Sequence, residues 1–234
     1  MSLATIDSTN DEALRRIEQG NLPLPCLITS HIQTQGRGRH RGRQWQGGAG
    51  NLFATFVIKQ PDGLPPTLLS LLVACALYRS VRFYVGPSAP LSLKWPNDIF
   101  LDQKKLGGIL IETAPQETLL VGIGLNIAIA PSLPAPSRPA ACLQDWYPFP
   151  ITTEKYLPVL LVALEEMFTV WKNQRAPAIL SAWQQASQDW GRPLSLRVGG
   201  KMIQGIFESL EAQGHLILRL PEGGRKVIAS GEVS

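Results

Sequence analysis

The sequence contains few charged residues and few cysteines. Of its 234 residues, 17% are charged and 44% are hydrophobic, which excludes a disordered chain because such chains have little apolar surface to bury. The three cysteines, Cys26, Cys75 and Cys142, are odd in number, widely spaced and without a CxxC pair or the spacing of a zinc site. They predict reduced, mostly buried thiols in a cytoplasmic protein.

Long hydrophobic runs are also missing. The longest apolar stretch, residues 68–78, is interrupted by Ser70 and ended by Arg79, whereas a membrane-spanning helix needs about 20 apolar residues. The first residues include no basic segment followed by an apolar one, so we expect no secretory signal. Glycine and proline, 21 and 19 residues, show no repeat period, which excludes collagen-like and solenoid folds. We therefore expect no membrane partner.

The length and charge limit the protein class further. A chain of 234 residues fits one large domain, or one domain with a small appendage. The net charge of +4 is small for a nucleic-acid-binding protein. Four arginines of one loop account for it, because the remaining basic residues equal the acidic ones in number.

Hydrophobic periodicity predicts alternating helices and strands in the first part of the chain. A helix is expected at residues 8–20, with Ser8 or Thr9 as its N-cap and Thr9 with Glu12 as a capping box. A second helix is expected from Pro65 and Pro66 to about residue 84. Strands are expected at residues 26–32, 51–58, 91–94, 99–101, 106–112 and 119–130.

The second part begins with a proline-rich irregular loop at residues 131–150. Leucine and aromatic residues then recur every three to four positions from Leu157 to Trp171, which predicts a long amphipathic helix, and another helix is expected at residues 178–190. The remaining residues alternate in short runs between glycine-containing turns, which predicts a small β-barrel. The expected organisation is an α/β domain at residues 1–188 and a β-barrel domain at residues 189–234.

One loop carries an unusual concentration of arginine and glycine. The segment Gly36-Arg-Gly-Arg-His-Arg-Gly-Arg-Gln-Trp45 places four arginines and three glycines in eight residues. Glycine lets a backbone fold tightly around a ligand, and arginine is a bidentate donor for phosphate and carboxylate. Trp45 adds a face on which a base could stack. The loop lies between two strands and does not repeat as RNA-binding arginine–glycine segments do, which favours a small anionic ligand. A basic RNA-binding patch is the alternative.

Two further clusters combine a lysine with strand glycines. Lys94-Trp-Pro-Asn-Asp98 is either an ordinary proline turn or a phosphate and Mg²⁺ site built from Lys94 and Asp98. Lys105-Leu-Gly-Gly-Ile-Leu110 and Gly122-Ile-Gly-Leu-Asn126 place glycines within strands, which marks either a bulge or a ligand lying close to the backbone. Asn126 ends an apolar strand, and a buried amide there needs hydrogen-bond partners, which an adenine edge could supply.

These blocks, with Asp7-Ser-Thr-Asn10 before them and Gly231-Glu-Val-Ser234 at the end, resemble the biotin–protein ligase family over nearly the whole chain. The pair of lysine-containing clusters is the most specific part of the resemblance. It implies a class II synthetase-like α/β catalytic domain, with a mixed sheet flanked by helices, followed by a small SH3-like β-barrel. It also implies ATP-dependent activation of biotin to biotinyl-5'-AMP and transfer of biotin to a lysine of the biotin carboxyl carrier protein of acetyl-CoA carboxylase. Lipoate–protein ligase is the closest alternative.

The resemblance also implies roles for individual residues. Arg37 and Lys105 would be catalytic. The biotin-binding set would be Ser8, Thr9, Asn10, Gln33, Arg37, Lys105, Gly108 and Gly122. The ATP-binding set would be Arg39, Arg41, Trp45, Lys94, Asn97, Lys105 and Asn126, with Asp98 placing Mg²⁺.

Two departures from the family pattern affect these expectations. One extra residue lies between Arg39 and Gly42, so either Arg39 or Arg41 is the phosphate-binding arginine. The first block begins at Ile6, which leaves no room for the DNA-binding domain of some bacterial relatives, so we expect no DNA partner. The chain could be a monomer or a homodimer.

Overall fold

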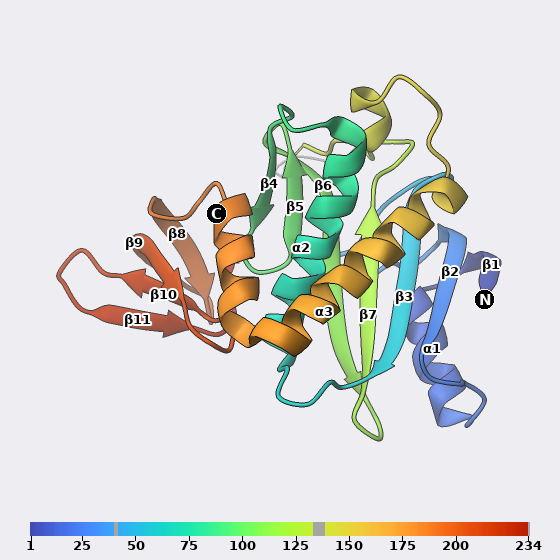
Figure 1. The fold of residues 1–234 in the computed structure, drawn as a ribbon, viewed down its shortest axis with the longest axis horizontal. Coiled ribbons are helices and arrows are strands. Elements are labelled where there is room, and N and C mark those ends of the chain that lie inside the picture. The colour runs from blue at the N-terminus through green and yellow to red at the C-terminus, as the bar shows by residue number, and fades with distance from the viewer. Residues whose placement is uncertain (40–41, 133–138, 234) are drawn as a thin grey trace.

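The computed structural model describes residues 1–39, 42–132 and 139–233. The described residues form a large sheet of seven strands in the order β1-β2-β3-β7-β6-β5-β4, with a smaller sheet beside it (Figure 1). The strands of the large sheet are β1 Ser2–Ile6, β2 Cys26–Gln33, β3 Leu52–Lys59, β4 Leu91–Lys94, β5 Asp98–Leu101, β6 Lys104–Ala114 and β7 Thr118–Leu125. Only the β1–β2 pair is parallel, so the sheet is mixed, as predicted.

Strand β1 was not predicted from the sequence. It is five residues long and pairs with β2 from Ser2 opposite Thr29 to Ile6 opposite Gln33. Most of its residues are exposed, so no hydrophobic run marks it. Its pairing with a strand more than twenty residues away stabilises it, and local patterns do not report such pairing.

The two faces of the large sheet are covered by different helices. Helices α2, Pro66–Val85, and α3, Thr153–Ala186, cover one face, where they build the main hydrophobic core (Figure 1). Helix α1, Thr9–Glu18, packs on the opposite face through a small separate cluster around Ala13 and Ile28. Residues of one strand alternate between these faces because side chains in a strand have a period of two.

Helix α2 is long and apolar enough to cross a membrane by length and composition alone. However, 67% of its apolar window is buried, and residues such as Leu69, Leu72 and Ala76 have no exposed surface. The burial by the sheet and α3 identifies it as the core helix of this domain. Cys75 lies on it, and burial raises the pKa of its thiol to about 12.

Several element ends differ from the predictions. Of the two predicted N-cap candidates, Ser8 caps α1, since its hydroxyl accepts from the backbone N–H of Asp11. Glu12 forms ion pairs with Arg15 and Arg16 instead of closing the predicted capping box. Strand β7 ends at Leu125 and not at residue 130. The carbonyls of the next two residues, Asn126 and Ile127, accept from the backbone N–H groups of Leu143 and Gln144, which begin the short 3-10 helix η1, Leu143–Trp146. Helix η1 itself lies in the loop that was predicted to be irregular.

The two helices predicted after residue 150 are joined in α3. Arg175 has φ 57° and ψ −155°, so the helix axis is broken there and two helical pieces follow one another without a loop. The second piece ends at Ala186 rather than at residue 190. The next residue, Ser187, is extended and forms a β-bridge with Leu93 of β4, which ends the helix.

The C-terminal residues form the predicted small β-domain, which is a five-stranded antiparallel sheet in the order β11-β10-β9-β8-β12. Its strands are β8 Pro193–Val198, β9 Lys201–Leu210, β10 Leu216–Arg219, β11 Arg225–Ile228 and β12 Glu232–Val233. The expected turns are present, with Gly200, Gly214 and Gly224 at positive φ, a region that favours glycine.

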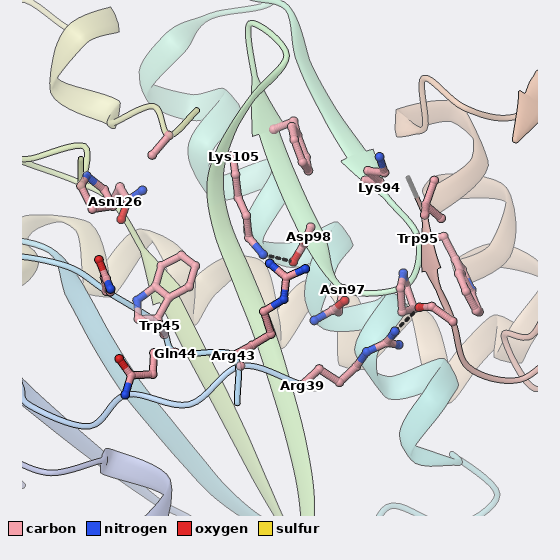
Figure 2. Close-up of a pocket in the computed structure, with 18 of the residues that line it drawn as sticks. Arg39, Arg43, Gln44, Trp45, Lys94, Trp95, Asn97, Asp98, Lys105 and Asn126 are labelled. Carbon is pink, nitrogen blue, oxygen red and sulfur yellow. Dashed lines mark hydrogen bonds and ion pairs between the residues drawn. The ribbon is translucent and has the colours of Figure 1, made fainter. Parts of the chain in front are cut away.

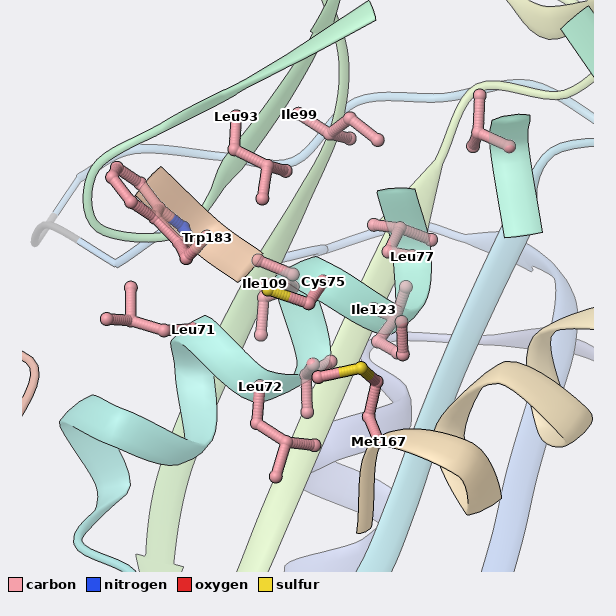
Figure 3. Close-up of a cluster of buried hydrophobic side chains, with 14 of the residues drawn as sticks. Leu71, Leu72, Cys75, Leu77, Leu93, Ile99, Ile109, Ile123, Met167 and Trp183 are labelled. Carbon is pink, nitrogen blue, oxygen red and sulfur yellow. The ribbon is translucent and has the colours of Figure 1, made fainter. Parts of the chain in front are cut away.

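The small sheet is fastened to the large domain by its 213–214 turn and by an aromatic contact. The indole N–H of Trp95 donates to the carbonyl of Gly214 at 3.1 Å, and Thr67 donates to the carbonyl of Gln213 at 2.5 Å. Trp183 of α3 packs 6.0 Å from the ring of Phe207, and Figure 3 shows it beside Leu71 and Leu93 in the core.

Replacing Trp183 by alanine is expected to lower the free energy of unfolding by about 3–5 kcal/mol, because this fully buried side chain fills the space between the two sheets. Urea denaturation would measure the change. Trp190→Ala is the matched control, since Trp190 is 47% exposed, and it should cost about 1 kcal/mol or less. Equal costs for the two variants would contradict the packing role of Trp183.

Candidate active site

Alternation along β7 separates the core from a polar face of the sheet. Val121 and Ile123 point into the main core, whereas Leu120 packs under α1, so Gly122 and Gly124 lie on the α1 face. Register places Gly122 between Thr55 of β3 and Leu110 of β6, and Gly124 beside Gly108. The strand glycines therefore form a flat strip of backbone, and polar side chains from the preceding motifs lie over it.

Two adjoining cavities lie here, and Gly108, Gly122 and Gly124 of the strip line the smaller one. The smaller, about 70 Å³, is lined by Ser8, Thr9, Asn10, Gln33, Arg37, Ala54, Ile109, Leu110, Gly108, Gly122 and Ile123, among others. The larger, about 380 Å³, is lined by Arg43, Gln44, Lys94, Trp95, Pro96, Phe100, Asn126, Gly231 and Val233, among others (Figure 2). Arg39, Trp45, Asn97, Asp98 and Lys105 belong to the walls of both. The structure thus brings together every predicted site residue that it describes, and Arg41 lies outside the described residues.

The smaller cavity has a hydrogen-bonded polar floor. The backbone N–H of Thr9 donates to Gln33 Oε1 at 2.7 Å, which leaves the Gln33 amide nitrogen as a donor. Thr55 Oγ1 lies 2.8 Å from Thr9 Oγ1 and 2.6 Å from Asn10 Oδ1. A Cβ on Gly122 would lie only 2.6 Å from Asn10 Oδ1, so the amide rests directly on the strand. The sequence interpretation missed Thr55, which supports this polar floor from beneath, although a threonine in the apolar run of β3 was a signal.

Arg37 is held at the edge of the smaller cavity by two carboxylates. Its guanidinium donates to both oxygens of Glu112 at 2.7 Å and to Asp11 Oδ1 at 2.7 Å. Partial burial by itself lowers the pKa of Arg37, but the hydrogen bonds and charges of Glu112 and Asp11 outweigh it and raise the pKa. Neither acidic residue was expected in the site, although Glu112 was visible as an acid ending the apolar run of β6.

Lys105 occupies the boundary between the two cavities. Its Nζ lies 2.7 Å from Asp98 Oδ1 and 5.7 Å from the centre of the Trp45 ring (Figure 2). Gly108 makes this arrangement possible, since a Cβ there would come within 3.1 Å of the Asp98 carboxylate. The Asn97 amide donates to the carbonyl of Ile109 at 2.7 Å and fixes the Lys94–Asp98 turn against β6. The Lys105 ammonium is therefore held where ligands bound in the two cavities would meet.

Trp45 lies flat on the glycine strip. A Cβ on Gly124 would be 2.5 Å from its Nε1, so no other residue type leaves room for the indole. The Trp45 N–H is buried and has no hydrogen-bond partner among the described residues. The side chain lines both cavities.

Asn126 is 1% exposed in the wall of the larger cavity, and the protein itself supplies its partners. Its amide donates to the carbonyl of Ala141 at 3.0 Å and accepts from Asn51 at 3.4 Å. One N–H and one lone pair remain for a ligand. The protein thus supplies part of the hydrogen bonding that the sequence analysis assigned to an adenine edge, and the adenine contact stays a prediction.

The C-terminal domain contributes to the larger cavity. The Arg39 guanidinium donates to the carbonyl of Gly231, and Val233 also lines the wall. This contact joins the arginine loop to a segment 192 residues further along the chain, and no sequence pattern indicated it.

Sequence and structure comparisons agree with this arrangement. Residues 2–127 match the biotin/lipoate A/B protein ligase family, and residues 190–234 match the biotin protein ligase C-terminal domain. The chain is 37% identical to a biotin–[acetyl-CoA-carboxylase] ligase of Paracoccus denitrificans, covering 99% of this chain and 98% of the relative. It is 33% identical to the same ligase of Mycobacterium tuberculosis, covering 97% and 85%.

Among solved structures, the biotin protein ligase of Aquifex aeolicus in complex with biotin and ATP is similar, with a TM-score of 0.84 and 26% identity over 100% of this chain and 97% of that one. Fold and site define a ligase with a catalytic α/β domain and a small β-domain. The chain belongs to the biotin/lipoate A/B protein ligase family, and its full-length relatives and C-terminal domain place it among the biotin protein ligases. The fold and the family expected from the motifs are confirmed.

A surface ion pair beside the site leads to a pH prediction. Hydrogen bonds from Arg15 at 2.8 Å lower the pKa of Asp7 from 3.8 to about 2. A lowered folded-state pKa gives stability that is present above pH 3.8 and lost as the pH falls through about 2. Asp7→Asn should therefore lower the free energy of unfolding by about 1 kcal/mol near neutral pH, after allowance for solvent screening.

Urea denaturation of both proteins between pH 7 and pH 2.5 measures this difference. It should shrink steadily below pH 3.8. A difference that stays constant down to pH 2.5 would show that the ion pair is not its source.

Proposed function

We propose that this protein activates biotin with ATP to form biotinyl-5'-AMP and then transfers biotin to a lysine of a biotin carboxyl carrier protein. The observation that carries the proposal is the sharing of Lys105 by two adjoining cavities, one suited to a small polar ring and one to a nucleotide. The similarity to a biotin–[acetyl-CoA-carboxylase] ligase supports the carrier protein of that carboxylase as the acceptor.

The smaller cavity is proposed to bind biotin. A ureido group needs donors for its carbonyl and acceptors for its two N–H groups, and Ser8, Thr9, Asn10 and Gln33 offer both kinds. The Gln33 amide nitrogen is the free donor, because Thr9 occupies the amide oxygen. Gly108 and Gly122 would line the biotin slot, and their lack of a Cβ lets Lys105 and Asn10 lie close to the backbone beside the ring. The cavity measures about 70 Å³ and adjoins the larger one, and Arg37 lines its edge.

The larger cavity is proposed to bind ATP, and its volume of about 380 Å³ is in the range of small-molecule sites. Lys94 and Arg39 would hold phosphate oxygens, with Arg41 as the alternative arginine. Trp45 would stack on the adenine, while Asn97 and Asn126 would offer amide groups to the nucleotide. Several of the loop's arginines thus line a cavity, which favours a small anionic ligand over the RNA alternative.

A magnesium ion fits the residues present. Among the described residues no group of three potential ligands of the His, Cys, Asp or Glu type is found. Mg²⁺ on a nucleotide usually needs only one or two carboxylates besides phosphate oxygens and water, and Asp98 in the wall of the larger cavity supplies one. Bound there, the ion would neutralise phosphate charge.

The first reaction joins two anions, so their repulsion must be offset. The biotin carboxylate oxygen attacks the α-phosphorus of ATP, the bond to the β-phosphate oxygen breaks, and pyrophosphate leaves. Lys105, which Asp98 positions at the cavity boundary, would stabilise the negative charge that develops on the α-phosphate, and Arg37 would hold the carboxylate. Because both cations are already fixed, little reorganisation is needed at the moment of attack.

In the second reaction the ε-amine of the acceptor lysine attacks the acyl carbon, an amide bond forms and AMP leaves. Acyl adenylates hydrolyse readily, so the arginine–glycine loop would exclude water from the intermediate. Three free cysteines are consistent with a cytoplasmic setting. Whether two copies associate does not enter the chemistry, since the two cavities described here lie within one chain.

Exchange of labelled pyrophosphate into ATP tests the first reaction. The wild-type protein should show exchange that depends on biotin and not on lipoate, and the reverse preference would support a lipoate ligase instead. The C-terminal domain match favours biotin. Lys105→Ala is the control, and its rate should fall by roughly 10²-fold because one transition-state donor is lost.

A matched pair of glycine variants tests the assignment of the two cavities. Gly124→Ala should displace Trp45 and raise the Michaelis constant for ATP about fivefold or more, since stacking contributes about 1–3 kcal/mol. Gly122→Ala should displace Asn10 and raise the constant for biotin. Each variant should leave the other substrate's constant nearly unchanged. If both variants affect both substrates equally, the cavity assignment is wrong.

A further inference from the structure

The two carboxylates that hold Arg37 come from different elements and are bound differently. Glu112, on β6, receives two hydrogen bonds from the guanidinium, and Asp11, in the first turn of α1, receives one. Both acids are partly exposed, 28% and 32% of their side-chain surface, and the guanidinium that they hold belongs to a residue lining the smaller cavity. Three of the five guanidinium N–H groups are thereby used.

Glu112 also binds the side chain of Asn10, on the floor of the smaller cavity. Its Oε2 also accepts from the Asn10 amide nitrogen at 2.8 Å, so Glu112 receives three N–H groups in all. This contact fixes the orientation of the Asn10 amide, whose oxygen then accepts from Thr55 Oγ1. Glu112 therefore links the arginine at the cavity edge to the polar floor of the cavity.

An anionic substrate would displace one of these two carboxylates from Arg37 more readily than the other. If Arg37 binds the biotin carboxylate, the incoming anion competes with its present partners and is repelled by them. Asp11 accepts a single hydrogen bond from Arg37, so the substrate carboxylate exchanges with it easily. Glu112 accepts three hydrogen bonds and stays bound to Arg37. Arg37 lines the smaller cavity, so a carboxylate that takes a hydrogen bond from its bound N–H groups replaces one of the present contacts.

We propose, building on the biotin ligase function above, that Glu112 is a positioning residue that holds Arg37 and Asn10 for biotin, whereas Asp11 is a displaceable latch that the biotin carboxylate replaces. The two acids are bound to the same guanidinium, yet their neutral variants have opposite effects on biotin affinity.

Glu112→Gln changes one atom but removes the positioning. A glutamine side chain has a single acceptor oxygen for the three N–H donors, and its own amide faces one of them, so at least one charged hydrogen bond is lost. Asp11→Asn keeps an acceptor but removes a negative charge beside the place of the substrate carboxylate, so biotin should bind more tightly.

The experiment measures the biotin dissociation constant by calorimetry, together with kcat and both Michaelis constants in pyrophosphate exchange. Glu112→Gln is expected to weaken biotin binding about tenfold or more, with the Michaelis constant for ATP changed less than about twofold. Asp11→Asn is expected to strengthen biotin binding by about two- to fivefold. Glu166→Gln is the matched control, because Glu166 is a 57% exposed partner of Arg79 on the other face, and it should behave as the wild type.

Weaker biotin binding by Asp11→Asn would overturn the latch, even if Glu112→Gln failed to fold. Unchanged biotin binding by a folded Glu112→Gln, or equal increases in both Michaelis constants, would overturn its positioning role. Failure of the proposed function has a different signature. In that case the wild-type protein would bind biotin without catalysing exchange, and the calorimetric constants would still decide the roles of Glu112 and Asp11. A wild-type protein that binds no biotin would overturn both proposals.

Discussion

The close approach of side chains to the bare backbone of β7 is the constraint on which the site depends. Gly122 and Gly124 have no Cβ, so Asn10 and Trp45 lie directly on the strand, each from a different motif far away in the chain. The alternating residues Val121 and Ile123 face the core. One strand therefore anchors the hydrophobic interior and forms part of the floor of the smaller cavity at once.

Much of the fold followed from the sequence because its signals are local. Helix α2 and the glycine turns of the C-terminal domain were predicted because neighbouring residues in the sequence determine them. Strand β1 and the end of α3 at Ser187 were missed because pairing with β2 and β4 decides them. The motifs likewise named the residues over the glycine strip. Thr55, Asp11 and Glu112 were missed because they act through partners distant in sequence.

The C-terminal domain participates in the site through two separate contacts. Trp95, in the turn that carries Asn97 and Asp98, is bonded to Gly214, and Arg39 is bonded to the carbonyl of Gly231. The small sheet therefore holds this turn and supplies part of the wall of the larger cavity. The small sheet is also joined to the large domain by packing, since its fully buried Phe207 belongs to the shared core.

Trp45 gives the molecule a built-in optical probe. Its indole lines both cavities, its N–H has no partner among the described residues, and the Lys105 ammonium lies 5.7 Å from its ring. Indole emission depends on the polarity and charge close to the ring. Trp95, which is 2% exposed, also lines the larger cavity, whereas Trp183 is fully buried in the core. The intrinsic fluorescence of the protein consequently contains a component that reports on the occupancy of the cavities without any attached label.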